Sequence, residues 1–191
     1  PKIAGQAAKI IENLGFDVLD LNCGCPVDKV TKDGSGSGLL KEPARIGEIL
    51  QEMVAAVQIP VTLKIRAGWD ESQICVEEVV QIAEQAGASA ITVHGRTREQ
   101  GYSGPANRDY IRRAKQAARS MIVLGNGDIL DPISAVAMWE ETGCDGILVA
   151  RGTLGAPWIA EDIRGYLRGE VLHVDEISRS KKALQDHFLA V

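Results

Sequence analysis

The sequence has few cysteines, no excess of positive charge and no long hydrophobic run. Its four cysteines, Cys23, Cys25, Cys75 and Cys144, lack the dense spacing of a secreted disulfide framework. No basic segment precedes an apolar stretch with a cleavage site, and no apolar run is long enough to cross a membrane. These absences exclude a disulfide-rich secreted domain and a membrane-spanning protein, and they predict a soluble protein of the reducing cytoplasm.

Net charge and residue spacing argue against a generally basic nucleic-acid-binding protein, a zinc protein and a dinucleotide-binding motif. Lys and Arg number 21 against 26 for Asp and Glu, so the net charge is −5 and a nucleic-acid partner requires a local basic patch or a segment outside this chain. Cys23 and Cys25 are not followed by a second pair of ligands at zinc spacing, so we expect no metal. The run Gly34-Ser35-Gly36-Ser37-Gly38 lacks G-x-G-x-x-G spacing, and we expect a mobile connector there.

Apolar segments of strand length alternate with segments of helical periodicity. The 191 residues and 45% hydrophobic content suit one core. Five runs rich in branched residues predict parallel strands buried on both faces, and they begin near Leu19, Val61, Ala90, Met121 and Gly146. Helices are expected near residues 3–14, 44–57, 75–86, 107–118, 132–142 and 158–167, with Gly87 ending the third.

Such a series of βα units fits either a doubly wound sheet or part of a (β/α)8 barrel. A whole barrel needs about 250 residues, and five units alone leave two strand edges open. The chain also begins without Met, inside a predicted helix. We therefore expect an incomplete barrel that comprises its last five strands and lacks an upstream part.

Polar residues follow all five predicted strands, where both folds place their active sites. Each could be a solvated strand end, but the repetition favours a shared site. They are Asn22 and Cys25, Lys64 and Arg66, His94 and Arg96, Asn126 and Asp128, and Arg151.

Cys25 lies between Gly24 and Pro26, which predicts a tight bend that holds its thiol just beyond the strand. An ordinary thiol, with a pKa of about 8.5, is mostly protonated at neutral pH and can donate a proton. A nucleophilic role would require a base or a helix dipole, and a buried core cysteine is the alternative to both.

Two pairs of residues at i and i+2 place basic side chains on one side of adjacent strands: Lys64 with Arg66, and His94 with Arg96. Cations beside the pyrimidine edge of a flavin would stabilise its reduced, anionic form. The alternative for Arg66 is an ion pair with Asp20, Glu78 or Asp128.

The last two strands end in Asn126-Gly127-Asp128 and Ala150-Arg151-Gly152. Glycines there let backbone N–H groups approach an oxyanion, and barrels commonly bind phosphate after strands seven and eight. We expect a phosphate site, with ordinary turn glycines as the alternative.

Taken together, these motifs resemble the tRNA-dihydrouridine synthases, flavin enzymes that reduce uridine in tRNA. The resemblance runs from about residue 5 to residue 167. It is carried by Asn22-Cys23-Gly24-Cys25-Pro26, Lys64-Ile65-Arg66, His94-Gly95-Arg96-Thr97-Arg98, Asn126-Gly127-Asp128 and Ala150-Arg151-Gly152.

The resemblance implies an FMN-binding TIM barrel, of which residues 1–170 supply strands four to eight, and a C-terminal helical domain that starts within residues 171–191. It implies that NADPH or NADH reduces FMN, and that Cys25 protonates C5 of uracil after hydride reaches C6. By the same resemblance, Lys64 and His94 contact the isoalloxazine. Asn126, Gly127, Asp128, Ala150 and Arg151 hold the ribityl-phosphate side, and Asn22, Arg96 and Arg98 contact the RNA substrate.

Two alternatives remain at this point. One is another FMN barrel that acts on a free pyrimidine, such as a relative of dihydroorotate dehydrogenase. The other is an inactive fragment, or an RNA-binding module, without flavin. The sequence indicates no particular protein partner.

Overall fold

The computed structural model describes residues 1–170 and 175–189 of the chain. Five parallel strands form one sheet in the order β1-β2-β3-β4-β5. A doubly wound sheet reverses its strand order at a switch point, whereas a barrel adds each strand beside the previous one. The order therefore confirms five consecutive units of a (β/α)8 barrel. The strands are β1 (Leu19–Cys23), β2 (Val61–Arg66), β3 (Ala90–His94), β4 (Ile122–Asn126) and β5 (Gly146–Leu148).

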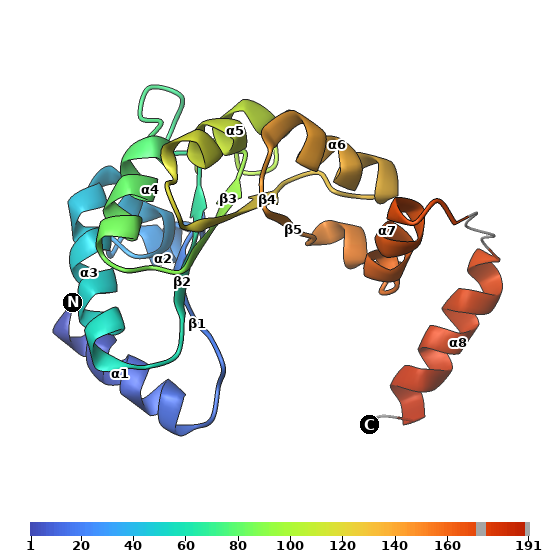
Figure 1. Ribbon diagram of the computed structural model, residues 1–191, viewed down its shortest axis with the longest axis horizontal. Helices are drawn as coiled ribbons and strands as arrows, with labels where there is room; N and C mark the ends of the chain where they lie inside the picture. Colours follow the sequence, from blue (N-terminus) through green and yellow to red (C-terminus); the bar gives the residue numbers. More distant parts are fainter. Residues whose placement is uncertain (171–174, 190–191) are drawn as a thin grey trace.

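Helices cover the convex face of the curved sheet (Figure 1). Each predicted helix is present, with ends within one or two residues of those expected. The larger helices are α1 (Lys2–Asn13), α3 (Pro43–Ala56), α4 (Val76–Gln85), α5 (Arg108–Ala117), α6 (Pro132–Thr142), α7 (Ile159–Leu167) and α8 (Glu176–Leu189). Short α2 (Asp28–Thr31) and the 3₁₀ helices η1 (Gly36–Lys41) and η2 (Arg151–Thr153) follow strands β1 and β5.

Local chemistry defines the ends of helix α6. The carboxylate of Asp131 accepts from the N–H of Ser134 at 2.7 Å, and the Ser134 hydroxyl accepts from the N–H of Asp131 at 3.1 Å. Pro132 occupies the first turn, where its missing N–H is not needed, and Gly143 ends the helix in the left-handed region. Gly87 follows α4 with a positive φ of 89°, so it ends the helix as predicted.

Strand register separates a core face from a polar face. Leu63, Ile65 and Val93 are fully buried against the helices. On the opposite, concave face, Asn22 aligns with Lys64, and one layer nearer the carboxyl ends Arg66 aligns with His94, which aligns with Asn126. The alternation of side chains along a strand thus assembles the predicted polar residues on one surface.

The helices drawn in Figure 1 lie along the convex side of the sheet, and among the described residues β1 and β5 each pair with one neighbouring strand. Ile122, on the concave face, is 49% exposed. Helix α8 lies apart from the arc of βα units, with Arg179 bonded to Asp162 of α7 at 2.7 Å. The predicted boundary at residues 170 and 171 stays a prediction, and residues 171–174 lie outside the described ranges.

The expectation of a mobile connector at residues 34–38 was wrong for its second half. Gly36 begins the 3₁₀ helix η1, and Ser37 is fully buried against the Cys25 segment. Gly36 and Gly38 let this segment pack closely against the backbone of Cys25 and Thr31, and a side chain at either position would clash there.

Candidate active site

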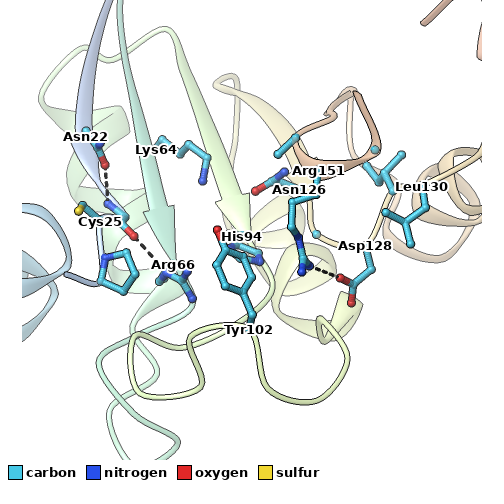
Figure 2. Close-up of a pocket in the computed structure, with 16 residues that line it drawn as sticks. Asn22, Cys25, Lys64, Arg66, His94, Tyr102, Asn126, Asp128, Leu130 and Arg151 are labelled. Atoms are coloured by element: carbon cyan, nitrogen blue, oxygen red, sulfur yellow. Dashed lines mark hydrogen bonds and ion pairs between the residues drawn. The ribbon is translucent and has the colours of Figure 1, made fainter. Parts of the chain in front are cut away.

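A cavity of about 310 Å³ lies at the carboxyl ends of the strands (Figure 2). Most of the residues singled out in the sequence line it. Its lining comprises Asn22, Gly24, Cys25, Pro26, Lys64, Arg66, His94, Tyr102, Asn126, Gly127, Asp128, Ile129, Leu130, Ala150, Arg151 and Gly152. Arg96 and Arg98 are the two predicted site residues that do not line it.

The guanidinium of Arg66 binds backbone carbonyl groups of the protein. Its guanidinium donates to the carbonyl oxygens of Gly24 at 3.0 Å, Thr97 at 2.9 Å and Gly101 at 2.8 Å. None of the carboxylates considered as partners for Arg66 pairs with it within the described residues. Arg66 therefore ties the segment before Cys25 to the loop after β3.

Lys64 lies beside Arg66 on the same face and lines the cavity. Burial lowers the pKa of its ammonium, and the neighbouring charge of Arg66 lowers it further. An anionic ligand in the cavity would stabilise the charged form of Lys64 and so offset the cost of its burial beside Arg66.

His94 is a neutral imidazole in this site. Burial lowers its pKa to about 3, and the charges of Arg66, Lys64 and Arg96 act in the same direction. Arg96 Nη1 lies 3.3 Å from His94 Nε2. Since a guanidinium can only donate, Nε2 accepts and the proton resides on Nδ1.

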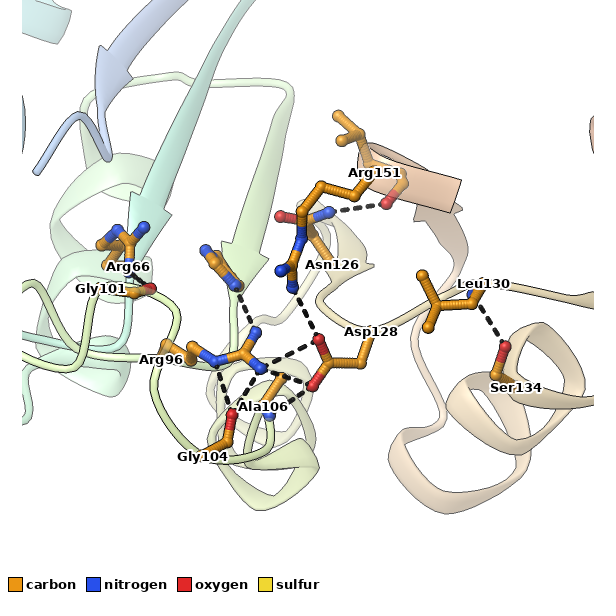
Figure 3. Close-up of polar contacts among 12 residues, drawn as sticks. Arg66, Arg96, Gly101, Gly104, Ala106, Asn126, Asp128, Leu130, Ser134 and Arg151 are labelled. Atoms are coloured by element: carbon orange, nitrogen blue, oxygen red, sulfur yellow. Dashed lines mark hydrogen bonds and ion pairs between the residues drawn. The ribbon is translucent and has the colours of Figure 1, made fainter. Parts of the chain in front are cut away.

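The carboxylate of Asp128 accepts hydrogen bonds from several protein groups, and its predicted cofactor contact stays a prediction (Figure 3). Its carboxylate accepts from Arg96 Nη2 at 2.7 and 3.0 Å, from Arg151 Nη2 at 3.0 Å and from the N–H of Ala106 at 2.8 Å. Burial alone would raise its pKa, but the bonds from Ala106 and Arg96 outweigh that effect and lower it. Asp128 also adopts a positive φ of 50°. The geometry favours an organising role for this carboxylate.

Arg96 faces inward. Its side chain is 3% exposed, and besides Asp128 it binds the carbonyl oxygen of Gly104 at 2.6 Å. In this conformation it holds the loop after β3 closed on itself, and it does not present its guanidinium to the surface. The contacts assign Arg96 a positioning role in this loop, and the RNA contact expected from the sequence stays a prediction.

Arg98 lies on the outer side of the same loop. It forms an ion pair with Asp28 of α2 and lies over the ring of Trp69, with its guanidinium carbon 4.6 Å from the ring centroid. The Lys41 ammonium lies 3.6 Å from the same centroid. Arg98 and Lys41 thus lie over one aromatic ring, and the RNA contact expected of Arg98 stays a prediction.

Glycines line the end of the cavity near β4 and β5. A Cβ on Gly127 would lie 2.6 Å from the Cβ of Ala106, and one on Gly152 would lie 2.3 Å from the carbonyl oxygen of Ile129. Asn126 donates from Nδ2 to the carbonyl of Leu148 at 2.7 Å, which leaves its Oδ1 to accept. Close packing against Ala106 and Ile129 therefore requires glycine at positions 127 and 152. The phosphate site expected at this end of the cavity stays a prediction.

Tyr102 is a lining residue that the sequence reasoning missed. It is 62% exposed, and the Arg151 guanidinium carbon lies 4.3 Å from its ring centroid. An aromatic residue between Gly101 and the Ser103-Gly104 turn was the signal that could have found it. Ile129 and Leu130 were missed as well, because they follow the strand-end motif and carry no polar group.

Cys25 lines the cavity and Cys23 does not. Cys23 is fully buried on the helix side, where burial raises its pKa to about 12. All four cysteines are free thiols. In Figure 2 the Cys25 sulfur lies on the side of its loop away from Lys64 and His94. Rotation about the Cα–Cβ bond is thus required to direct this thiol toward them.

Residues 1–170 and 175–189 contain neither a candidate metal cluster nor a helix that could cross a membrane. Within those ranges no three His, Cys, Asp or Glu residues gather as metal ligands. No helix in the same ranges combines the length and apolar character needed to cross a bilayer.

Solved structures share the fold. The chain superimposes on phosphoenolpyruvate phosphomutase from Streptomyces platensis subsp. rosaceus with a TM-score of 0.60 and 21% identity, over 88% of this chain and 62% of that one. It matches phosphonopyruvate hydrolase with a TM-score of 0.59 and 22% identity, over 82% and 58% of the two chains. At this identity the likeness establishes the fold alone.

Sequence relatives identify the family. The chain is 45% identical to tRNA-dihydrouridine synthase B of Pseudomonas putida, over all of this chain and 56% of the relative. It is 43% identical to tRNA-dihydrouridine synthase B of Escherichia coli K12, over 98% of this chain and 58% of the relative. The chain thus spans a little over half the length of these relatives. The family model for dihydrouridine synthase (Dus) matches residues 1–191, and the chain belongs to that family.

Proposed function

We propose that the protein containing this chain is a tRNA-dihydrouridine synthase. It binds FMN at the cavity, takes reducing equivalents from NADPH or NADH, and saturates the C5=C6 bond of uridine in cytoplasmic tRNA. The observation that carries the proposal is the convergence of Cys25, Lys64, His94 and the glycine loops of β4 and β5 on one cavity, in a member of this family.

The lining residues fit FMN in charge and shape. Lys64 and Arg66 supply cations for a ring that gains negative charge on reduction, and neutral His94 supplies a hydrogen-bonding group without a further charge. The loops after β4 and β5 line the cavity with Gly127, Ala150 and Arg151, and the exposed guanidinium of Arg151 suits a phosphate. Asp128 supports this end indirectly, because it fixes the guanidinium of Arg151.

Reduction of uracil requires hydride at C6 and a proton at C5. Reduced FMN supplies the hydride when bound. Cys25 Sγ–H donates the proton to C5, the pair of electrons of the C5=C6 π bond forms the new C–H bond, and the resulting thiolate regains a proton from solvent. A positioned donor is essential because the two carbons must be saturated on a base held in one orientation.

Asn22 is placed to orient that base. Its Oδ1 accepts from the N–H of Gly24 at 2.9 Å, which aims its Nδ2 donor as a fixed group. Uracil carbonyls are acceptors for such a donor. To reach the cavity the uridine has to leave its stack, at a cost of roughly a few kcal/mol. Arg98, with Lys41 and Trp69, offers a rim contact for the surrounding RNA.

The test uses the complete protein and cells that lack its gene. We expect the purified protein to show flavin absorbance, and tRNA from the deletion strain to lose dihydrouridine at one or more positions, measured by mass spectrometry. A Lys64→Ala variant should bind FMN more weakly or slow its reduction. Colourless protein, unchanged tRNA, or turnover of free dihydroorotate with none of tRNA would contradict the proposal.

A further inference from the structure

Two donors from one residue hold the carbonyl oxygen of Cys25. Ser37 Oγ donates to this oxygen at 2.8 Å, and the Ser37 N–H donates to it at 3.0 Å. Ser37 is fully buried, although it belongs to a glycine-rich segment twelve residues further along the chain. The Cys25–Pro26 peptide group is therefore fixed from its carbonyl side.

The preceding peptide group is fixed as well. Arg66 Nε donates to the carbonyl oxygen of Gly24 at 3.0 Å, and the Gly24 N–H donates to Asn22 Oδ1 at 2.9 Å. Pro26 restricts the backbone of the residue before it to extended conformations. With both flanking peptide groups held, the sulfur of Cys25 retains one torsion, χ1, which has three staggered positions.

Gly36 makes this contact sterically feasible. It has a φ of 55°, and a Cβ at this position would lie 2.9 Å from the Cys25 carbonyl oxygen and 3.0 Å from the Cys25 Cβ. Gly34 also has a positive φ, of 72°, but a Cβ there would have no heavy atom within 4 Å. Substitution of Gly34 would strain the backbone alone, whereas substitution of Gly36 would both strain the backbone and clash with Cys25.

We propose that Ser37, brought close by Gly36, is a positioning residue that fixes the direction of the Cα–Cβ bond of Cys25 for proton donation. The inference rests on the proposed function, because it assigns Ser37 a role through the thiol donor. It gives the buried half of the glycine-rich segment a function in the chemical step, in place of the mobile connector expected from the sequence.

The test compares Ser37→Ala with Ser35→Ala in the complete enzyme. Ser35 is exposed, lies two residues away and makes no side-chain capping bond, so it is a matched control. For S37A we expect FMN content and reduction by NAD(P)H to stay within about 2-fold of the parent, while reoxidation of the reduced enzyme by tRNA slows about 10-fold, since small displacements of a reacting group have effects of this order. S35A should match the parent in both half-reactions.

Hydrogen exchange supplies a readout that does not depend on turnover. The peptide covering residues 23–28 should exchange faster in S37A and at the parental rate in S35A. Unchanged exchange in S37A, or equal slowing of both half-reactions, would overturn the inference.

A Cys25→Ala enzyme separates this inference from the proposed function. If C25A loses reoxidation by tRNA and S37A keeps it, Ser37 does not position the donor. If C25A itself keeps its rate, the proposed acid role of Cys25 fails, and the inference drawn from it fails with it.

A second pair of variants tests the same contact without removing the hydroxyl. Gly36→Ala should slow reoxidation by tRNA at least as much as S37A, because its methyl group pushes Ser37 away from Cys25. Gly34→Ala carries a similar backbone strain without the clash and should retain most of the rate. Equal effects of the two substitutions would contradict the role of close approach.

Discussion

The two walls of the cavity hold their side chains by different means. On the β1–β2 wall, backbone carbonyls of the Cys25 loop accept from Arg66 and Ser37. On the wall formed by the loops after β3, β4 and β5, one carboxylate, Asp128, accepts from two arginines and a backbone N–H. The first wall fixes a backbone that carries a neutral donor. The second fixes charged groups relative to each other.

This difference predicts different responses to substitution. Loss of a donor on the first wall leaves carbonyl oxygens without a partner, and no carboxylate takes part in those bonds. Loss of Asp128 on the second wall leaves a buried guanidinium without its counter-charge. Stability measurements on paired variants can therefore establish whether the two walls are as distinct as the contacts indicate.

Arg66→Met is expected to have the largest effect on stability. It removes charge-assisted bonds to the carbonyls of Gly24, Thr97 and Gly101 while keeping an apolar chain of similar length. We expect unfolding free energy to fall by about 3 kcal/mol, measured by urea denaturation. Arg112→Met, whose parent pairs with Asp109 at the surface, should change it by less than about 1 kcal/mol. A loss below about 1 kcal/mol for R66M would remove the distinction drawn for this wall.

Asp128→Asn should come second. Asparagine tolerates the positive φ, so the substitution tests the charge and spares the backbone. Arg96 is 3% exposed and Asp128 is 32% exposed, so we expect a loss of about 2 kcal/mol, below that of a fully buried pair. Glu170→Gln removes a carboxylate from an exposed pair with Arg168 and should cost less than about 0.5 kcal/mol. Equal losses in the two variants would show that the Asp128 network is not a buried one.

His94, between the two walls, makes the stability of the folded chain depend on pH. The pKa of His94 is about 3 in the folded chain and about 6.5 in the unfolded chain. Between these two pH values the unfolded state binds a proton and the folded state does not, so the free energy of unfolding falls as the pH is lowered. The stability that neutral His94 contributes is fully present above pH 6.5 and is lost progressively as the pH falls toward 3. The groups acting on it are Arg66, Lys64, Arg96 and Asp128.

Replacement of His94 by Gln should remove that dependence. Between pH 6 and pH 5 we expect the parent to lose roughly 1 kcal/mol more unfolding free energy than H94Q, as denaturation curves at each pH would show. Identical slopes for the two proteins would indicate that His94 is not held neutral between the cationic side chains.

Much of this architecture was predictable from the sequence, because strands and helices follow from local apolar periodicity. Runs such as Val61–Arg66 and Ala90–His94 carry that signal by themselves. The choice between a barrel and a doubly wound sheet was not local, since both use the same βα units. Strand order decided it.

The site was predictable as a set of residues and less so as a set of roles. Strand ends of a parallel sheet converge, so Lys64, His94 and Asn126 were expected together. The role of Asp128 depends on its partners, and a sequence does not show that Arg96 and Ala106 reach the same carboxylate. Ser37 was missed because a glycine-rich segment is commonly flexible, whereas here its glycines permit close packing.

The central claim is that the thiol of Cys25 protonates uracil at this cavity, and the Cys25→Ala form of the complete enzyme tests it most directly. We predict that C25A binds FMN and is reduced by NAD(P)H at the parental rate, but that its reoxidation by tRNA, with formation of dihydrouridine, slows by at least about 100-fold. Parental rates in both half-reactions would contradict the account.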